Sequence, residues 1–380
     1  MQKECMDGFS RKFDTFDEMI DYHKELSAKS KWVREKISEL FVAALDMTSP
    51  LIGSIGLFAS EISDDAVMDT VSNMGLAMQV EGEYYPLRGT AYKSLLDRAK
   101  ISGTALPKLK KEDLANTLNA CFHLFESEAL LLVRNEKVSA VHSGDETDYS
   151  ILPVNELLGV LQGKLDVRFA GNVFTEGYSD HALTSAEWEM PSQKEELLGT
   201  YSKVLEANGK KAMAYKVMPG IRFSTSDTGI SSAKVSAMLM GLQYPIHIGG
   251  CLSVDHRNRA KVSDFEEQLE QLFAQFGDSV KKLSKLLEID LEYPVNAMTR
   301  VCKRLALPKK AAVEAIAMFE MANGDNPATA HDVFMAMQEI PYILKTQGVP
   351  ESKMLTVEEN MARALTIKWE EYDLAKGVNW

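Results

Sequence analysis

The first 45 residues carry apolar side chains at helical spacing. The apolar positions are Phe13, Phe16, Ile20, Trp32, Ile37, Leu40, Phe41 and Ala44. Recurrence every three or four residues is typical of side chains on one face of an α-helix. A polar stretch at 27–31 interrupts the pattern. The sequence therefore predicts two helices over 13–45, with a break between them.

Three further segments near the N-terminus also predict helices. Ser63 precedes two aspartates, whose charges suit the positive end of a helix dipole. Apolar residues repeat at helical spacing in 91–101 and 111–125. A glycine-rich turn at 53–56 leads into the first of these helices. We therefore expect 1–126 to form a mainly helical region.

Between residues 127 and 260 the apolar runs shorten, and β-branched, aromatic and turn residues become frequent. This pattern predicts a central antiparallel α+β region. Arg134–Glu136 separates two such runs, and Glu176-Gly177 separates another two, so each turn predicts one hairpin. Strands are expected at 129–133, 137–142, 165–175, 178–190, 211–218, 221–225, 234–242 and 245–248, and helices at 153–161 and 192–207.

From Ser263 onward the pattern is helical almost to the end of the chain. Ser263–Glu266 and Thr356–Glu359 have the spacing of a capping box, and Pro294 and Pro308 suit helix starts. We therefore expect 261–380 to be a helical region. The predicted fold class is α+β, with a central, mostly antiparallel sheet of hairpins flanked by an N-terminal helical region and a C-terminal helical bundle.

Composition narrows the possible settings. A net charge of −13 argues against attraction of the whole protein to nucleic acid, but it leaves room for a local basic groove. The longest apolar windows are far shorter than the roughly 18 to 20 residues that cross a bilayer. The N-terminus lacks the apolar core of a secretory signal, and the four cysteines show no CxxC spacing. We expect a cytoplasmic protein with reduced thiols, no membrane partner and no cofactor.

Arg257, Arg259 and Lys261 are candidates for nucleic-acid binding. They alternate along a loop that follows the last predicted strand. Basic side chains at this spacing on an extended segment can contact successive phosphates of a single strand. The competing interpretation is a solvated loop before a helix, and it is favoured because short charge runs are common on surfaces.

Ser224, Ser226, Asp227 and Gly229 form a candidate ligand loop. They gather hydroxyls, a carboxylate and a glycine into a turn after a predicted strand. Such a turn can bind a metal-nucleotide, or it can cap itself through Asx and Ser/Thr turns. Self-capping is the favoured interpretation, because these residues form such turns routinely.

His247, Cys251 and His256 are weak candidates for a metal site. A structural zinc site needs four ligands, usually with a tight pair such as CxxC, so a strand-end turn with a buried cysteine is favoured. With Asp255, the two histidines are also the one cluster that merits a test for catalysis. No residue is assigned a catalytic role, and an enzyme is the least supported class.

Two blocks of the chain resemble a family of phage- and plasmid-borne proteins, domain of unknown function 932. The block Phe223–Ser231 is similar to the family's Ser-Asp-x-Gly stretch ahead of an extended segment. The block Thr329–Phe334, followed by Gln338-Glu339 and a helix at 359–369, is similar to the family's Thr-Ala-Tyr-Asp-Leu-Tyr helix and its following Thr-Glu. The resemblance covers about 120–370. It implies a mobile-element setting and no assigned reaction.

Two functions of different classes follow. The first is a non-enzymatic accessory of phage DNA metabolism that binds nucleic acid, single-stranded in the simplest form, through the central sheet and the 257–261 loop. Net acidity and the lack of an aromatic-basic strand signature count against it. The second is a protein-binding or structural component, either a homo-oligomer or a partner of host or phage proteins. It would use the Met-rich C-terminal helices.

Overall fold

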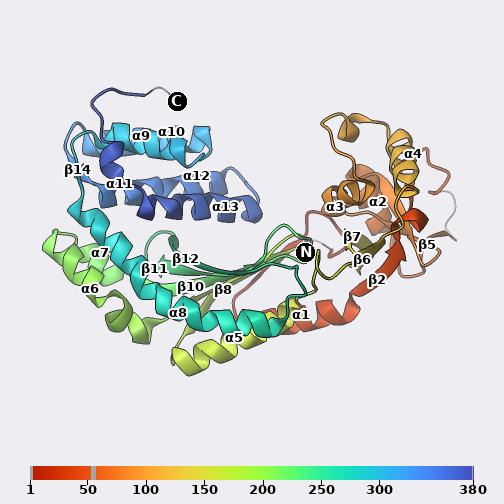
Figure 1. Ribbon diagram of the computed structural model, residues 1–380, viewed down its shortest axis with the longest axis horizontal. Helices are drawn as coiled ribbons and strands as arrows, with labels where there is room; N and C mark the ends of the chain where they lie inside the picture. The colour runs from red at the N-terminus through yellow and green to blue at the C-terminus, as the bar shows by residue number, and fades with distance from the viewer. Residues whose placement is uncertain (1–2, 53–56, 379) are drawn as a thin grey trace.

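The computed structural model describes residues 3–52, 57–378 and 380. The chain forms a crescent, with an N-terminal lobe at one end, the C-terminal helices at the other and a large sheet between them (Figure 1). The glycine-rich turn predicted at 53–56 lies outside the described residues. Within the described ranges, no helix has the length and apolar character needed to span a bilayer.

The central sheet has six strands in the order β1-β8-β9-β10-β11-β12, and each neighbouring pair is antiparallel. The strands are β1 Ser10–Phe13, β8 Val173–Asp180, β9 Thr184–Glu189, β10 Met218–Thr225, β11 Ala233–Met240 and β12 Ile246–Val254. Strand alternation sends Trp188, Ile221 and Phe223 to one face, where they are fully buried. The predicted α+β class with a central antiparallel sheet is confirmed.

Four helices cover this apolar face of the sheet (Figure 1). They are α1 Phe16–Lys29, α5 Val154–Arg168, α6 Lys194–Ala207 and α8 Val262–Lys285. Phe223 of β10 meets Phe265 of α8 edge to face, with ring centroids 5.9 Å apart. Trp188 Nε1 donates to Gln162 Oε1 of α5 at 2.8 Å, so the indole is buried without an unsatisfied donor.

The opposite face of the sheet is polar. One row of cross-strand partners is Lys12, Tyr178, Ser185, Ser224, Lys234 and Ser253. The next row is Glu176, Glu187, Arg222, Ser236 and Cys251. Helices α12 (Glu339–Thr346) and α13 (Glu351–Ala362) lie over part of this face (Figure 1). Charged groups on the sheet therefore face the C-terminal helices.

The N-terminal lobe has its own apolar core and two three-stranded sheets, β2-β6-β7 and β3-β4-β5. A parallel bridge between Leu87 and Val138 joins these two sheets. The strands are β2 Lys31–Lys36, β3 Phe41–Ala44, β4 Leu76–Val80, β5 Glu83–Pro86, β6 Glu128–Arg134 and β7 Lys137–Ser143. The helices are α2 Asp64–Ser72, α3 Ala91–Ala99 and α4 Lys111–Phe122. Ser63 caps α2 by accepting from the Ala66 N–H, as the sequence predicts.

The second helix predicted within 13–45 is wrong. β1 precedes α1, and the chain after Ser30 forms β2 and β3. β2 pairs with β6 along its whole length, and this long-range pairing overrides a local apolar recurrence. β6 and β7 thus hydrogen-bond inside the N-terminal lobe rather than in the central sheet. The region boundaries at 126 and 260 stay predictions.

The two predicted hairpins differ in outcome. The first is confirmed, because Asn135 and Glu136 turn between β6 and β7 with left-handed φ values of 48° and 68°. The second hairpin turns at 181–183 instead of Glu176-Gly177. Asp180 starts that turn. Its Oδ1 accepts from the backbone N–H groups of Ala182 and Leu183 at 2.7 and 2.8 Å.

Helical structure extends further than predicted in the central region. Residues 165–168 end α5, and the predicted strand at 211–218 is helix α7 (Lys211–Lys216) followed by the start of β10. The predicted helix at 192–207 is confirmed as α6, and Gly209 follows its cap with a φ of 74°. Local patterns thus identified the long helix but missed the short one.

The C-terminal region is helical, as predicted. Its other helices are α9 Pro294–Arg304, α10 Lys309–Asn323 and α11 Ala330–Met337, with a short ladder of β13 Asp290–Leu291 and β14 Ala328–Thr329. Both predicted capping boxes are wrong. The carboxylate of Asp264 accepts from the Lys261 N–H at 2.8 Å, so α8 begins earlier, and 356–359 lies inside α13. A capping box is present instead at Thr329 and Asp332.

Candidate functional site

The loop after β10 ties the central sheet to the N-terminal lobe. Asp227 Oδ2 accepts from Arg134 Nη2 at 2.7 Å, and the two side chains are 9% and 14% exposed. The Asp227 carbonyl accepts from Tyr149 Oη at 2.9 Å and lies 2.8 Å from His142 Nε2. Because a carbonyl only accepts, His142 carries a proton on Nε2. We call this contact region the lobe junction.

The rest of the predicted ligand loop shapes the turn. Ser226 Oγ accepts from the backbone N–H groups of Thr228 and Ile230, both at 3.2 Å, which is the self-capping arrangement favoured from the sequence. Gly229 has a φ of 75°, and a Cβ there would lie 3.4 Å from His142 Cε1. Ser224 belongs to the polar face of the sheet. Only Asp227 makes an ionic contact.

Three stacked rings form the core of the lobe junction. The rings of His142 and Tyr149 are 3.5 Å apart and nearly parallel, and His256 stacks on Tyr149 at 5.6 Å. Burial lowers the pKa of His142 to about 4 and also lowers the pKa of His256. Burial raises the pKa of Tyr149 well above its usual value. All three rings are therefore neutral at pH 7.

The candidate metal and catalytic cluster is not assembled. His256 Nδ1 faces the Ser150 carbonyl and its Nε2 faces Thr225 Oγ1, both at 3.2 Å. His247 lies on β12, where its Nδ1 accepts from a backbone N–H, and Cys251 is also on β12. In the part of the chain that the structure describes, no three His, Cys, Asp or Glu side chains gather to hold a metal ion.

Two of the three predicted basic residues line one hollow. Arg259 and Lys261 border a space of about 540 Å³ at the lobe junction, together with Arg34, Glu146 and Tyr149. Both predicted residues are exposed, and neither forms an ion pair with any described residue. The Arg259 N–H donates to the Glu146 carbonyl at 2.9 Å, which docks the loop on the N-terminal lobe.

The remaining predicted residue faces elsewhere. Arg257 Nη2 lies 2.6 Å from Asp255 Oδ2, so its charge is compensated locally. Arg34 of β2, rather than Arg257, is the third basic residue at the hollow. Its Nη2 lies 3.5 Å from the Glu146 carboxylate, so its charge is partly compensated. Sequence reasoning missed Arg34 because we interpreted its strand as a helix. The period-two alternation of a strand would have placed Arg34 and Trp32 on one face.

A second cavity, of about 140 Å³, opens next to the hollow, and Ile151 lines both. We call it the Trp32 cavity. Its walls include Trp32, His23 and Asn155. His23 Nε2 and Asn155 Oδ1 are buried there and have no hydrogen-bond partner in the described structure. Buried polar atoms are normally paired, so these two are exceptions on side chains that line the cavity.

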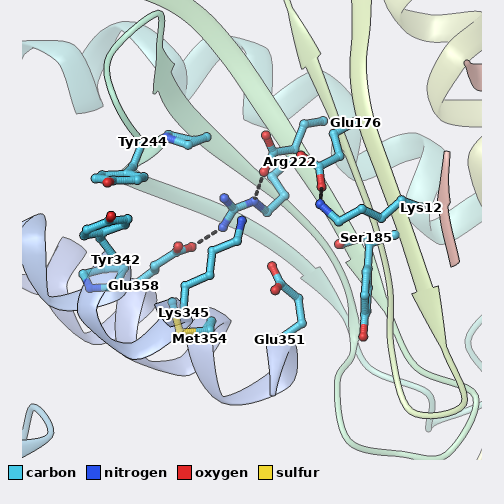
Figure 2. Close-up of a pocket in the computed structure, with 14 residues that line it drawn as sticks. Lys12, Glu176, Ser185, Arg222, Tyr244, Tyr342, Lys345, Glu351, Met354 and Glu358 are labelled. Carbon is cyan, nitrogen blue, oxygen red and sulfur yellow. Dashed lines mark hydrogen bonds and ion pairs between the residues drawn. The ribbon is translucent and has the colours of Figure 1, made fainter. Parts of the chain in front are cut away.

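A third cavity, of about 130 Å³, lies between the polar sheet face and helices α12 and α13 (Figure 2). Arg222 Nε donates to Glu187 Oε1 at 2.7 Å, and its Nη1 donates to Glu358 of α13. Burial raises the pKa of Glu358. The rings of Tyr244 and Tyr342 stack beside this cluster at 4.7 Å.

The Arg222 cluster fastens α13 to the sheet. Lys234 of β11 forms a second bridge, to Glu359 of α13, at 2.8 Å. Lys345 and Glu351 point from the helices toward Arg222 (Figure 2). Since the arginine already has two carboxylate partners, this cavity is best explained as an ionic anchor between layers.

No family model, curated protein or solved structure compared with this chain matches it. The resemblance to domain of unknown function 932 therefore stays a prediction. The lobe junction brings together the loop that contains Asp227 and the 257–261 loop, two segments that the sequence indicated independently as candidate sites.

Proposed function

We propose that the protein binds single-stranded nucleic acid at the lobe junction, as a non-enzymatic accessory of a phage or related element. One observation carries the proposal. Arg259 and Lys261 are exposed and lack ion-pair partners among the described residues, and with Arg34 they border a single hollow of about 540 Å³. This size lies within the range of roughly 300–1,000 Å³ that is typical of ligand sites.

The net charge of the chain does not oppose this local contact. Charges further away than a Debye length of about 8 Å are largely screened at physiological salt. Near the hollow, Arg34 is partly neutralised by Glu128 and Glu146. Arg259 and Lys261 form no ion pair with any described residue, although the charge of Arg259 also acts on the Asp145 carboxylate. A chain of phosphates would replace water around these two cations.

An aromatic ring beside the hollow favours a single strand over a duplex. Tyr149 lines the hollow, but its buried ring is already stacked on His142 and His256. The half-buried Trp32, 6.0 Å from Tyr149, is therefore the ring left for a base. Proteins that bind single strands combine a cationic groove with aromatic side chains on which unpaired bases stack. Bases within a duplex are not available for such stacking.

The alternative proposal is a homo-oligomer or a partner of host or phage proteins. It rests on α10, where Val313, Met318 and Met321 are 45%, 46% and 86% exposed. Met337 of α11 is fully buried and belongs to the core. A cytoplasmic location in the host cell is part of both proposals.

Fluorescence anisotropy with a labelled oligothymidylate, measured over a series of salt concentrations, tests the main proposal. For single strands, the logarithm of affinity falls with the logarithm of salt by about 0.7 for each phosphate neutralised. The double variant Arg259→Ala, Lys261→Ala should bind more weakly, with a slope shallower by about 1.4. The matched control is Lys282→Ala, Lys285→Ala, which removes the same charge from exposed positions at the far end of α8.

The control variant should keep the wild-type slope. Equal weakening by both double variants would mean that only total charge matters, and it would contradict a site at the lobe junction. Absence of salt-dependent binding by the wild-type protein would refute the proposal altogether.

A further inference from the structure

We propose that the Trp32 cavity holds one pyrimidine base of the bound strand. This inference rests on the proposed function and assigns the base-recognising part of the same site. It follows from the size of the cavity, from unpaired polar atoms on two of the side chains that line it and from its continuity with the cationic hollow.

The size of the cavity selects a single ring. Its volume of about 140 Å³ is close to that of a protein cavity of roughly 150 Å³ known to take up benzene. Trp32, Pro153 and Val154 supply apolar walls to this space. A planar ring can therefore lie against the indole, while a fused purine is too large to enter fully.

The polar atoms select the edge of that ring. His23 is 3% exposed, and its Nε2 has no partner among the described residues. Burial lowers the pKa of His23 to about 3, so the ring is neutral at pH 7 and Nε2 can carry a hydrogen. Asn155 Oδ1 accepts hydrogen bonds only. These two side chains thus offer one donor and one acceptor, beside the Arg134–Asp227 pair and the hydroxyls of Ser27 and Ser30, which also line the cavity.

Pyrimidine bases present the complementary pair. Thymine and uracil have a carbonyl next to a ring N–H on their pairing edge, and cytosine has a ring nitrogen next to an amino group. In each case the base acceptor can take the proton of His23 Nε2, and the base donor can face Asn155 Oδ1. Both buried atoms of the protein then gain partners, which removes the cost of leaving them unpaired.

The cavity is also placed to receive a base from a strand in the hollow. Ile151 lines both spaces, and Trp32 and Arg34 lie two residues apart on the same face of β2. Exposed Ser27 and Ile151 border the opening. Arg134 Nε donates to Ser30 Oγ at 2.7 Å while its Nη2 holds Asp227, so the rim is braced by the lobe junction itself.

The decisive comparison uses the wild-type protein with two oligonucleotides of equal phosphate number, oligothymidylate and an abasic strand. We expect oligothymidylate to bind about tenfold more tightly, the order of one stacked and hydrogen-bonded base. Equal affinities with normal salt dependence would overturn this inference, since the cavity then holds only water, and would leave the proposed function intact. Loss of salt dependence would instead refute the proposed function.

A variant separates the two parts of the site. Asn155→Leu keeps a similar side-chain size but removes Oδ1, and it should abolish the preference for thymine without changing the salt slope. Arg259→Ala, Lys261→Ala should do the reverse, weakening both strands and keeping the preference. Free thymidine should alter the emission of the wild type but not of Trp32→Phe. A thymine preference that survives in Asn155→Leu would overturn the inference, and the wild-type comparison decides if that variant does not fold.

Discussion

The ion pair between Asp227 and Arg134 should be a major stabiliser of the lobe junction. Replacing Asp227 by Asn keeps the side-chain shape and the backbone carbonyl, so only the negative charge is lost. The partners are 9% and 14% exposed and 2.7 Å apart, and Arg134 would then be left as a buried, unpaired charge. Breaking a buried pair in this way costs about 3–5 kcal/mol of the free energy of unfolding.

The matched control is Asp278→Asn, which removes the same charge from an exposed pair with Lys281. Those side chains are 67% and 73% exposed, and solvent-exposed pairs of this kind contribute little to stability. Urea unfolding followed by circular dichroism gives both free energies. Asp227→Asn should unfold at clearly lower urea than Asp278→Asn. Equal midpoints would refute the view that this buried pair holds the lobes together.

Two further predictions concern the histidine stack and a backbone contact. The folded pKa of His142 is about 4 and that of His256 is also lowered, so both lie below the unfolded value of about 6.5. Below about pH 6.5 the unfolded state therefore binds more protons than the folded state. The free energy of unfolding should be constant above about pH 6.5 and fall from there toward pH 4, and a flat profile in urea titrations would contradict the buried neutral stack. Gly241→Ala should destabilise the protein by at least about 2 kcal/mol more than Gly209→Ala. Both glycines have φ values near +75°, so the backbone strain is the same in the two variants. A Cβ at Gly241 would lie 2.1 Å from the Lys216 carbonyl oxygen, whereas a Cβ at Gly209 would meet nothing within 4 Å. Thermal unfolding of the two variants compares them, and similar losses would argue against the close backbone contact.

Helices and one hairpin were predictable from the sequence because their signals are local. Ser63, Pro294 and Pro308 mark helix starts that the structure contains, and a two-residue turn follows Arg134 as expected. β2 was missed because its apolar residues fit a helical recurrence, and only its pairing with β6, about a hundred positions later, makes it a strand. Long-range pairing is invisible to a local window.

The candidate site shows the same division. Asp227 and Arg259 were singled out from turn chemistry and charge, but nothing in the sequence indicates that their loops meet the same lobe. The Arg222 cluster was missed because its partners lie 35 and 136 residues away along the chain. The Trp32 cavity was missed because buried atoms without partners become visible only when the packing around them is known.

Hydrogen–deuterium exchange with saturating oligothymidylate tests the central claim most directly, because it reports where the strand lies. We predict slower exchange of backbone amides in 144–151 and 257–261, two of the segments that border the hollow, and unchanged exchange in α10. Protection confined to α10 or to the helices over the Arg222 cluster, with none at the lobe junction, would contradict the account.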